Sequence, residues 1–147
     1  MLSNTSKYAI RAVIYLAVKA KKDERLGIKK IADSLDIPSP FLGKILQVLV
    51  RRKILSSTKG PNGGFGIGKR TNKITLYDII IEMEGSDLFE SCLLGAGSCE
   101  NQKENGTYCA MHDEFGPARQ QLIDLYKSKT IEQLAEKAKN GEGEIVL

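Results

Sequence analysis

The sequence predicts a mainly α-helical fold that carries one small β-hairpin. Apolar residues recur at helical spacing through the first 50 residues and again after residue 113, whereas glycine is concentrated near residue 62. A chain of 147 residues with 41% hydrophobic content is long enough for one compact domain, or for one small domain plus an appendage. We therefore expect several short helices around one core and a longer helix towards the C-terminal end.

The first predicted helix covers residues 5–21. Its apolar stripe consists of Ala9, Ala12, Val13, Leu16, Ala17 and Ala20. Lys7, Arg11 and Lys19 interrupt this stretch, so it has neither the apolar core of a secretory signal nor the roughly 20 apolar residues of a membrane span. We expect a cytoplasmic protein without a membrane partner.

Two short helices joined by a tight turn are predicted next. The spacing i, i+3, i+4, i+7 appears twice, at Ile28, Ile31, Ala32, Leu35 and at Leu42, Ile45, Leu46, Leu49. Pro38 ends the first helix, because a residue that precedes proline is pushed out of helical conformation. Ser39 is the expected N-cap of the second helix, with Pro40 at its first position. This arrangement matches a helix-turn-helix, a motif that also occurs in proteins that never bind DNA.

The charge of the chain is unevenly distributed. Residues 1–75 hold 16 basic and 4 acidic side chains, a net charge of +12, whereas residues 76–147 have a net charge of −8. A basic half joined to an acidic half suggests that the first half binds a polyanion such as nucleic acid. A solvated basic surface is the alternative interpretation.

The exposed face of the second short helix has the residue types of a recognition helix. It is expected to present Ser39, Gly43, Lys44, Gln47, Arg51 and Arg52, with Phe41 beside them and outside the apolar stripe. Recognition helices place their first residues against base edges, while cations contact phosphates. The alternative is a basic helix that faces only solvent.

A glycine-rich hairpin is predicted directly after this helix. Lys59, Gly60, Pro61, Asn62, Gly63 and Gly64 can form its tip, because asparagine and glycine tolerate positive φ. The stretch lacks the Gly-Lys-Ser/Thr ending of a phosphate-binding loop. A hairpin in this position is the wing of a winged helix-turn-helix. Its narrow tip would bring Lys59 to the minor groove, with Lys69 and Arg70 nearer the phosphates.

The acidic half predicts three further helices. Thr75 and Asp78 form a capping-box pattern ahead of Ile79, Ile80 and Met83, and Gly85 ends that helix. A long helix opening near Gly116–Pro117 carries the apolar seam Phe115, Ala118, Leu122, Leu125 and Tyr126. Thr130 and Gln133 cap the last helix. Such a seam is either core or a dimer interface.

All three cysteines and the only histidine lie within residues 92–112. They are Cys92, Cys99, Cys109 and His112. In a cytoplasmic protein, an odd number of cysteines favours free thiols or metal ligands over a disulfide framework. Thiolates and imidazole suit an iron–sulfur cluster or zinc, although a zinc finger normally shows Cys-x2-Cys pairs. Three incidental cysteines are the alternative.

Enzymatic function is not expected from these residues. The sequence offers neither a Ser–His–Asp set nor a nucleotide-binding fingerprint. A nucleophile formed by Cys109 and His112 is conceivable, but no third orienting group can be named. An electron carrier or cluster-delivery protein would use the cysteines and leave the basic half without a role.

The chain resembles the Rrf2 family of winged-helix regulators, which includes IscR, NsrR and CymR. The similarity runs through TSKYAIRAVIYLA, IADSLDIPSPFLGKILQVLVRRKIL, SSTKGPNGGFGIGK and ITLYDIIIEMEG to TIEQLA. KGPNGGF is the most specific match, because the wing of the family carries a basic residue, Gly-Pro and a glycine-rich tip. The resemblance implies a homodimer that binds a dyad-symmetric operator in double-stranded DNA and usually represses transcription.

The resemblance also assigns residues. The base-contacting positions fall on Ser39, Pro40, Phe41 and Gly43, and the minor-groove cation on Lys59. Some members present hydroxyls and a carboxylate at these positions, so the operator is expected to differ. The cysteine segment resembles that of the cluster-binding members, and the resemblance implies that Cys92, Cys99, Cys109 and His112 of this chain are the ligands of a 2Fe–2S cluster, which an aerobic preparation can lack. Other members have no cluster and respond through a reactive thiol or a partner protein.

Three functional segments follow from these predictions. Residues 1–84 form the winged helix-turn-helix domain, residues 85–112 form the cysteine-rich sensor loop, and residues 113–147 form the dimerisation helix and a C-terminal helix.

Overall fold

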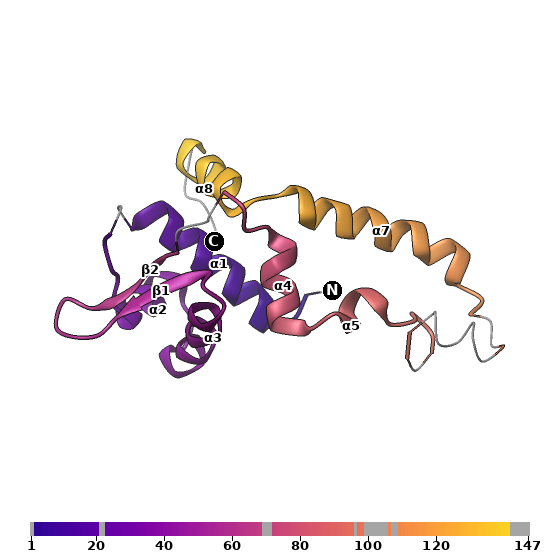
Figure 1. Cartoon of the computed structure of the whole chain (residues 1–147), viewed down its shortest axis with the longest axis horizontal. Helices are drawn as coiled ribbons and strands as arrows, with labels where there is room; N and C mark the ends of the chain where they lie inside the picture. Colours follow the sequence, from indigo (N-terminus) through magenta and orange to yellow (C-terminus); the bar gives the residue numbers. More distant parts are fainter. Residues whose placement is uncertain are drawn as a thin grey trace.

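The computed structural model describes residues 2–20, 23–68, 72–95, 97–98, 106 and 109–141. Lys69, Arg70 and Cys99, which the sequence singled out, lie outside the described residues. The elements form a helical body with a projecting hairpin at one end and a long helix extending away at the other (Figure 1). The mainly α-helical fold with one small β-hairpin is confirmed.

The chain begins with α1, Asn4–Lys19, and the helix-turn-helix follows as α2, Ile28–Leu35, and α3, Ser39–Arg51. Ser3 caps α1 by accepting a hydrogen bond from the Ser6 amide. Asp36 ends α2 in the left-handed region at φ 52°. The expected cap of α3 is wrong in detail: Pro38 is the N-cap and Ser39 already belongs to the helix. Pro40 still lies in the first turn, where its missing amide would have had no helical acceptor.

The wing consists of β1, Leu55–Thr58, and β2, Gly64–Ile67, which pair antiparallel from Leu55↔Ile67 to Thr58↔Gly64. A third segment joins them, because Leu26 and Phe65 exchange two backbone hydrogen bonds of 2.8 and 2.9 Å. Gly64 has φ 141°, and a Cβ at that position would come within 2.6 Å of the Leu26 carbonyl carbon. Only glycine therefore allows the wing to lie this close to the segment before α2.

The hydrophobic core joins the two ends of the chain. Its fully buried members include Leu16, Leu42, Leu46, Leu49, Ile79 and Ile131. Ile131 is the first residue of α8, Ile131–Asn140, which packs against α1. Helix α8 thus lies in the third predicted segment but packs with the first. The division at residues 84 and 112 remains a prediction.

Helix α4, Leu76–Glu84, and the short helix α5, Asp87–Glu90, lead out of the body, and α7, His112–Ser128, returns to it. The predicted start of α7 near Gly116–Pro117 is wrong, because the helix begins at His112 and contains Pro117. Gly116 has no Cβ to clash with the proline ring, so it tolerates helical conformation before Pro117. Within the described ranges, none of the helices combines length and hydropathy sufficient to span a bilayer.

The last turn of α4 is tied to the start of α1 by Glu84, whose Oε1 accepts a 2.7 Å hydrogen bond from the Ser3 amide. Partial burial acts to raise the pKa of Glu84, but hydrogen bonding outweighs it, and the pKa lies below its ordinary value of 4.5. The carboxylate therefore binds its proton more weakly in the folded chain than in the unfolded chain.

Glu84→Gln should therefore weaken the dependence of folding stability on pH in the acid range. The Glu84 contribution is fully present above the unfolded pKa and is lost as pH falls through the lower folded pKa. Between about pH 5 and pH 3, the melting temperature should fall further in the wild type than in the variant. Thermal unfolding followed by circular dichroism measures this difference, and Glu90→Gln, an exposed carboxylate on α5, is the matched control. Parallel pH profiles for wild type and Glu84→Gln would contradict the assignment.

Candidate nucleic-acid interface and cysteine segment

Helix α3 is held by one apolar face and leaves the other to solvent. Leu42, Ile45, Leu46 and Leu49 are buried in the core. On the other side, the exposed residues are Pro40, Phe41, Lys44, Gln47 and Arg51, whereas Ser39 and Gly43 are half-buried. Gly43 faces α2, since a Cβ there would lie 3.1 Å from Ile28 Cδ1. The predicted face is thus presented by α3, with Gly43 acting mainly as a close packing position.

Arg52 does not share this face. Its Nε lies 2.7 Å from Oε2 of Glu82 on α4, in an ion pair whose side chains are 63% and 23% exposed. Arg52 therefore joins the end of α3 to α4, whereas Arg51 is directed to solvent. This contrast was not visible in the sequence, where the two arginines are adjacent.

The wing tip is narrow and presents a cation. Lys59, Gly60, Pro61 and Asn62 are exposed, and Gly63 and Gly64 are half-buried. The Gly63 amide donates a 2.9 Å hydrogen bond to the Gly60 carbonyl, which closes the turn. Gly60 adopts φ 107°, whereas Asn62 does not use the positive φ that was expected of it. Figure 1 shows the hairpin projecting from the helical body.

Several residues beside the interface were missed by sequence reasoning. Tyr8 of α1 packs against Phe41, with ring centroids 5.8 Å apart and planes at 87°. Both aromatic residues lie off the apolar stripe of their helix, and this shared property could have paired them. Lys29 and Lys30 are exposed at the start of α2, and their adjacency was the available signal.

The cysteine segment brings two of its cysteines to the start of α7. Cys92 is buried just after α5, and its amide donates to the Gly97 carbonyl at 2.8 Å. Cys109 is half-buried, and its carbonyl accepts a 3.0 Å hydrogen bond from the amide of His112, the first residue of α7. The His112 side chain is exposed.

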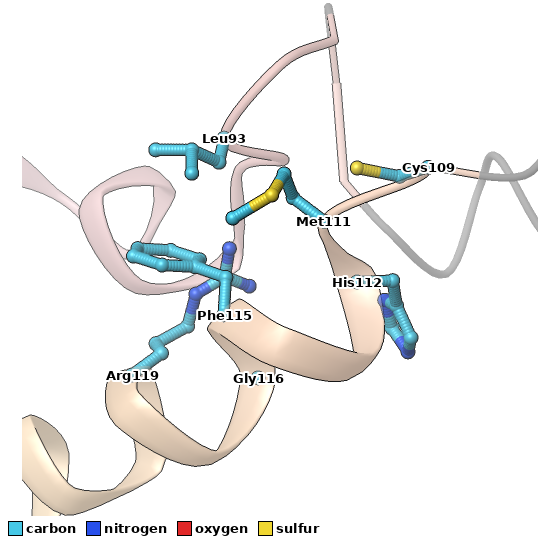
Figure 2. Close-up of a pocket in the computed structure, with 7 residues that line it drawn as sticks. All are labelled: Leu93, Cys109, Met111, His112, Phe115, Gly116 and Arg119. Atoms are coloured by element: carbon cyan, nitrogen blue, oxygen red, sulfur yellow. The ribbon is translucent and has the colours of Figure 1, made fainter.

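A small hollow lies at this end of α7. Its lining consists of Leu93, Cys109, Met111, His112, Phe115, Gly116 and Arg119 (Figure 2). The Arg119 guanidinium lies 4.8 Å from the Phe115 ring centroid and donates a 2.5 Å hydrogen bond to the Ser91 carbonyl. Arg119 therefore fastens the residue before Cys92 to α7. In Figure 2 the His112 ring points away from Leu93 and from the Cys109 sulfur.

The side-chain types in the cysteine segment suit an iron–sulfur cluster, but the described side chains are not arranged as a metal site. Thiolates and one imidazole are chemically suitable ligands. Among the residues that the structure describes, however, no three His, Cys, Asp or Glu side chains form a group able to hold a metal ion. The described donors Cys92, Cys109 and His112 therefore do not by themselves make a preformed site.

Aromatic packing connects the cysteine segment to α4 and α7. Phe89 of α5 stacks on Tyr77 of α4 at 5.1 Å and meets Tyr126 of α7 edge-on at 6.1 Å. The Lys127 ammonium lies 4.6 Å from the Tyr77 ring centroid. Phe89 is buried, so this junction fixes α5, and with it the position of Cys92, against both longer helices.

The apolar seam of α7 is not part of the core. Within the described chain no residue of α7 is buried, and Leu122 and Leu125 are 43% and 49% exposed. These two leucines form an apolar surface on a helix that extends away from the body (Figure 1).

Comparison with known proteins assigns the family. Residues 2–137 match the model of the Rrf2 family, described as an iron-dependent transcriptional regulator. A helix-turn-helix-type transcriptional regulator of Aquifex aeolicus is 35% identical over 134 residues, covering 91% of this chain and 90% of the relative. The regulator NsrR of Bacillus licheniformis is 26% identical over 133 residues, or 90% of each chain.

Solved structures show the same fold. CymR, the global cysteine regulator of B. subtilis, matches with a TM-score of 0.74 at 22% identity, over 92% of this chain and 96% of that one. IscR of T. potens matches with a TM-score of 0.72 at 20% identity, over 97% and 93%. The winged helix-turn-helix architecture is thereby confirmed, and the family and its relatives are transcriptional regulators rather than enzymes. The chain belongs to the Rrf2 family of transcriptional regulators.

Proposed function

We propose that this protein is a homodimeric repressor that binds a dyad-symmetric operator and senses redox, iron or nitric oxide status through a 2Fe–2S cluster. The observation that carries the DNA-binding part is the shared exposure of Lys44, Gln47 and Arg51 on α3 and of Lys59 at the wing tip. Helix α3 would enter the major groove and the wing would follow the backbone into the minor groove.

The base contacts are assigned to the start of α3 and to Gln47 further along the helix. Ser39 has a hydroxyl for hydrogen bonds, Gln47 has a side-chain amide, and Phe41 offers an apolar edge suited to thymine methyl groups. Lys44 and Arg51 lie along the same helix and would neutralise phosphates on either side of the groove. Pro61, Asn62, Gly63 and Gly64 shape a tip thin enough to bring Lys59 to the minor groove.

The sensor part rests on donor chemistry and on the connections of the segment. Cys92, Cys99, Cys109 and His112 would hold the cluster, which supplies one-electron redox chemistry and reactivity toward oxygen and nitric oxide when bound. Arg119 ties Ser91 to α7, and Phe89 ties α5 to α4 and α7. A rearrangement around the cysteines would therefore move α7 relative to α4. A coupling of about 1–3 kcal/mol would change operator affinity roughly 5- to 150-fold.

A second candidate is a cluster-free regulator of the same fold, controlled by a reactive thiol or by a partner protein. It is favoured by the half-buried position of Cys109, which keeps part of its solvent exposure. The DNA-binding face and the dimer would be the same in both candidates.

A mobility-shift assay tests the DNA-binding function. The probe is a duplex selected by the protein from a random pool, and the full chain should give a discrete, sequence-dependent shift. Lys59→Ala and Arg51→Ala should each weaken the complex and reduce the slope of log affinity against log salt by about one counterion. Lys137→Ala, on α8, is the matched control. Unchanged binding in both variants would contradict the proposed DNA-binding face.

The dimer generates a second prediction. Two recognition helices about 34 Å apart would meet successive major grooves on one side of the duplex. Leu122→Asp with Leu125→Asp should give monomers that lose specific binding, as measured by light scattering and mobility shift. Gln120→Glu adds a carboxylate about 200° around the helix from Leu122 and should leave the dimer intact. A wild type that is monomeric at micromolar concentration would contradict the operator symmetry.

The cluster generates a third prediction, read from visible spectra of protein purified anaerobically with ample iron. Cys92→Ala, Cys99→Ala and Cys109→Ala should each abolish the charge-transfer absorption, and iron and sulfide assays should agree. His112→Ala should only weaken the absorption, because its side chain is turned away from Cys109. Colourless wild-type protein that binds its operator tightly would instead support the cluster-free candidate.

A further inference from the structure

Phe41 is unusual among the residues of the DNA-binding face because a side chain from another helix holds it. Its ring is 42% exposed, and the edge-to-face contact with Tyr8 covers part of the remainder. Edge-to-face pairs are favoured by the opposite charge distributions of ring face and ring edge, so they select an orientation as well as a distance. Tyr8 thereby limits the side-chain rotamers that Phe41 can adopt.

Tyr8 is in turn contacted by Arg11 of the same helix. The Arg11 guanidinium lies 5.9 Å from the Tyr8 ring centroid, and its Nη2 donates a 2.6 Å hydrogen bond to the Leu35 carbonyl. Leu35 is the last residue of α2, so Arg11 satisfies an acceptor at the end of that helix. Phe41, Tyr8 and Arg11 therefore form a continuous contact from α3 across α1 to the turn that separates α2 from α3.

We propose that Tyr8 is a positioning residue for operator discrimination, which fixes the exposed edge of Phe41 so that it meets one set of base pairs. The proposal rests on the proposed function, in which Phe41 contacts bases. A freely rotating phenylalanine would contact several bases almost equally well, whereas an oriented ring gains contact with a thymine methyl only at particular positions. Tyr8 acts through Phe41 and need not touch a base.

The expected effect is on the choice of sequence more than on affinity in general. Loss of an edge-to-face pair should reduce discrimination at the base pairs opposite Phe41 by roughly 2- to 12-fold. Binding to unrelated duplexes depends on Lys44, Arg51 and Lys59 and should change little, as should its salt dependence. A residue needed only for stability would weaken binding to all duplexes together.

The test measures full-chain binding to the selected operator and to variants carrying each single base-pair change. Tyr8→Leu and Tyr8→Met remove the ring but keep an apolar side chain suited to a helix, so two variants guard against a folding defect in one. Tyr8→Phe keeps the ring and removes the hydroxyl. Phe41→Leu and the Tyr8→Leu/Phe41→Leu pair complete a double-mutant cycle, and thermal unfolding is recorded for each protein.

We expect the same base pairs to lose discrimination in Tyr8→Leu, Tyr8→Met and Phe41→Leu, with no further loss in the double variant. Tyr8→Phe should behave as the wild type. Unchanged base preference in the folded Tyr8 variants would overturn the inference while leaving the proposed function intact. A Tyr8→Phe variant as impaired as Tyr8→Leu would assign the effect to the hydroxyl and also overturn it. If the wild type showed no sequence preference, the proposed function itself would fail.

Discussion

Two backbone hydrogen bonds hold the chain together where it leaves its helical body and where it returns. The Leu76 amide donates to the Lys129 carbonyl at 3.0 Å, and the Ile131 amide donates to the Ile74 carbonyl at 2.9 Å. Capping boxes begin helices α4 and α8 at this junction, each of which then buries an isoleucine in the common core. The chain leaves the body through α4 and returns through α7 at this junction, and α4 is tied to the body at two further places, by Glu84 to Ser3 and by Glu82 to Arg52.

The same junction separates the proposed DNA-binding face from the cysteine segment. The proposed DNA-binding face is built on a core that α1, α3 and α8 share, and α3 is further joined to α4 by the ion pair of Arg52 and Glu82. The cysteine segment lies outside that core and is held mainly by the Phe89 junction and by Arg119. The described part of the cysteine segment thus has fewer buried residues than the helical body, and local rearrangement costs least where buried contacts are few.

Apolar spacing and capping patterns predicted the helices that depend on residues close together along the chain. Apolar spacing placed α2 and α3, and the Thr75 and Thr130 capping boxes placed the starts of α4 and α8. The errors came from longer-range effects. The Leu26–Phe65 pairing has no sequence signature, and Pro117 was taken as a helix start although Gly116 allows the helix to run through it. Residue types in the sequence predicted a set of DNA-facing residues, but they could not separate Arg51 from Arg52 or pair Tyr8 with Phe41, because those differences depend on which neighbours the fold supplies.

Helix α7 links the cysteine segment to the junction, so a tilt of this helix about the junction would be largest at its cysteine end. At 1.5 Å per residue, the 17 residues of α7 extend about 25 Å, with Cys109 just before one end and the junction at the other. A tilt of about 5° about the junction would displace the far end by about 2 Å, less than the rise of one base pair. In a dimer joined along α7, the same tilt would carry the two winged domains through a comparable displacement. A change at the cysteines too small to disturb the core would thus shift one recognition helix relative to the other by less than the rise of one base pair.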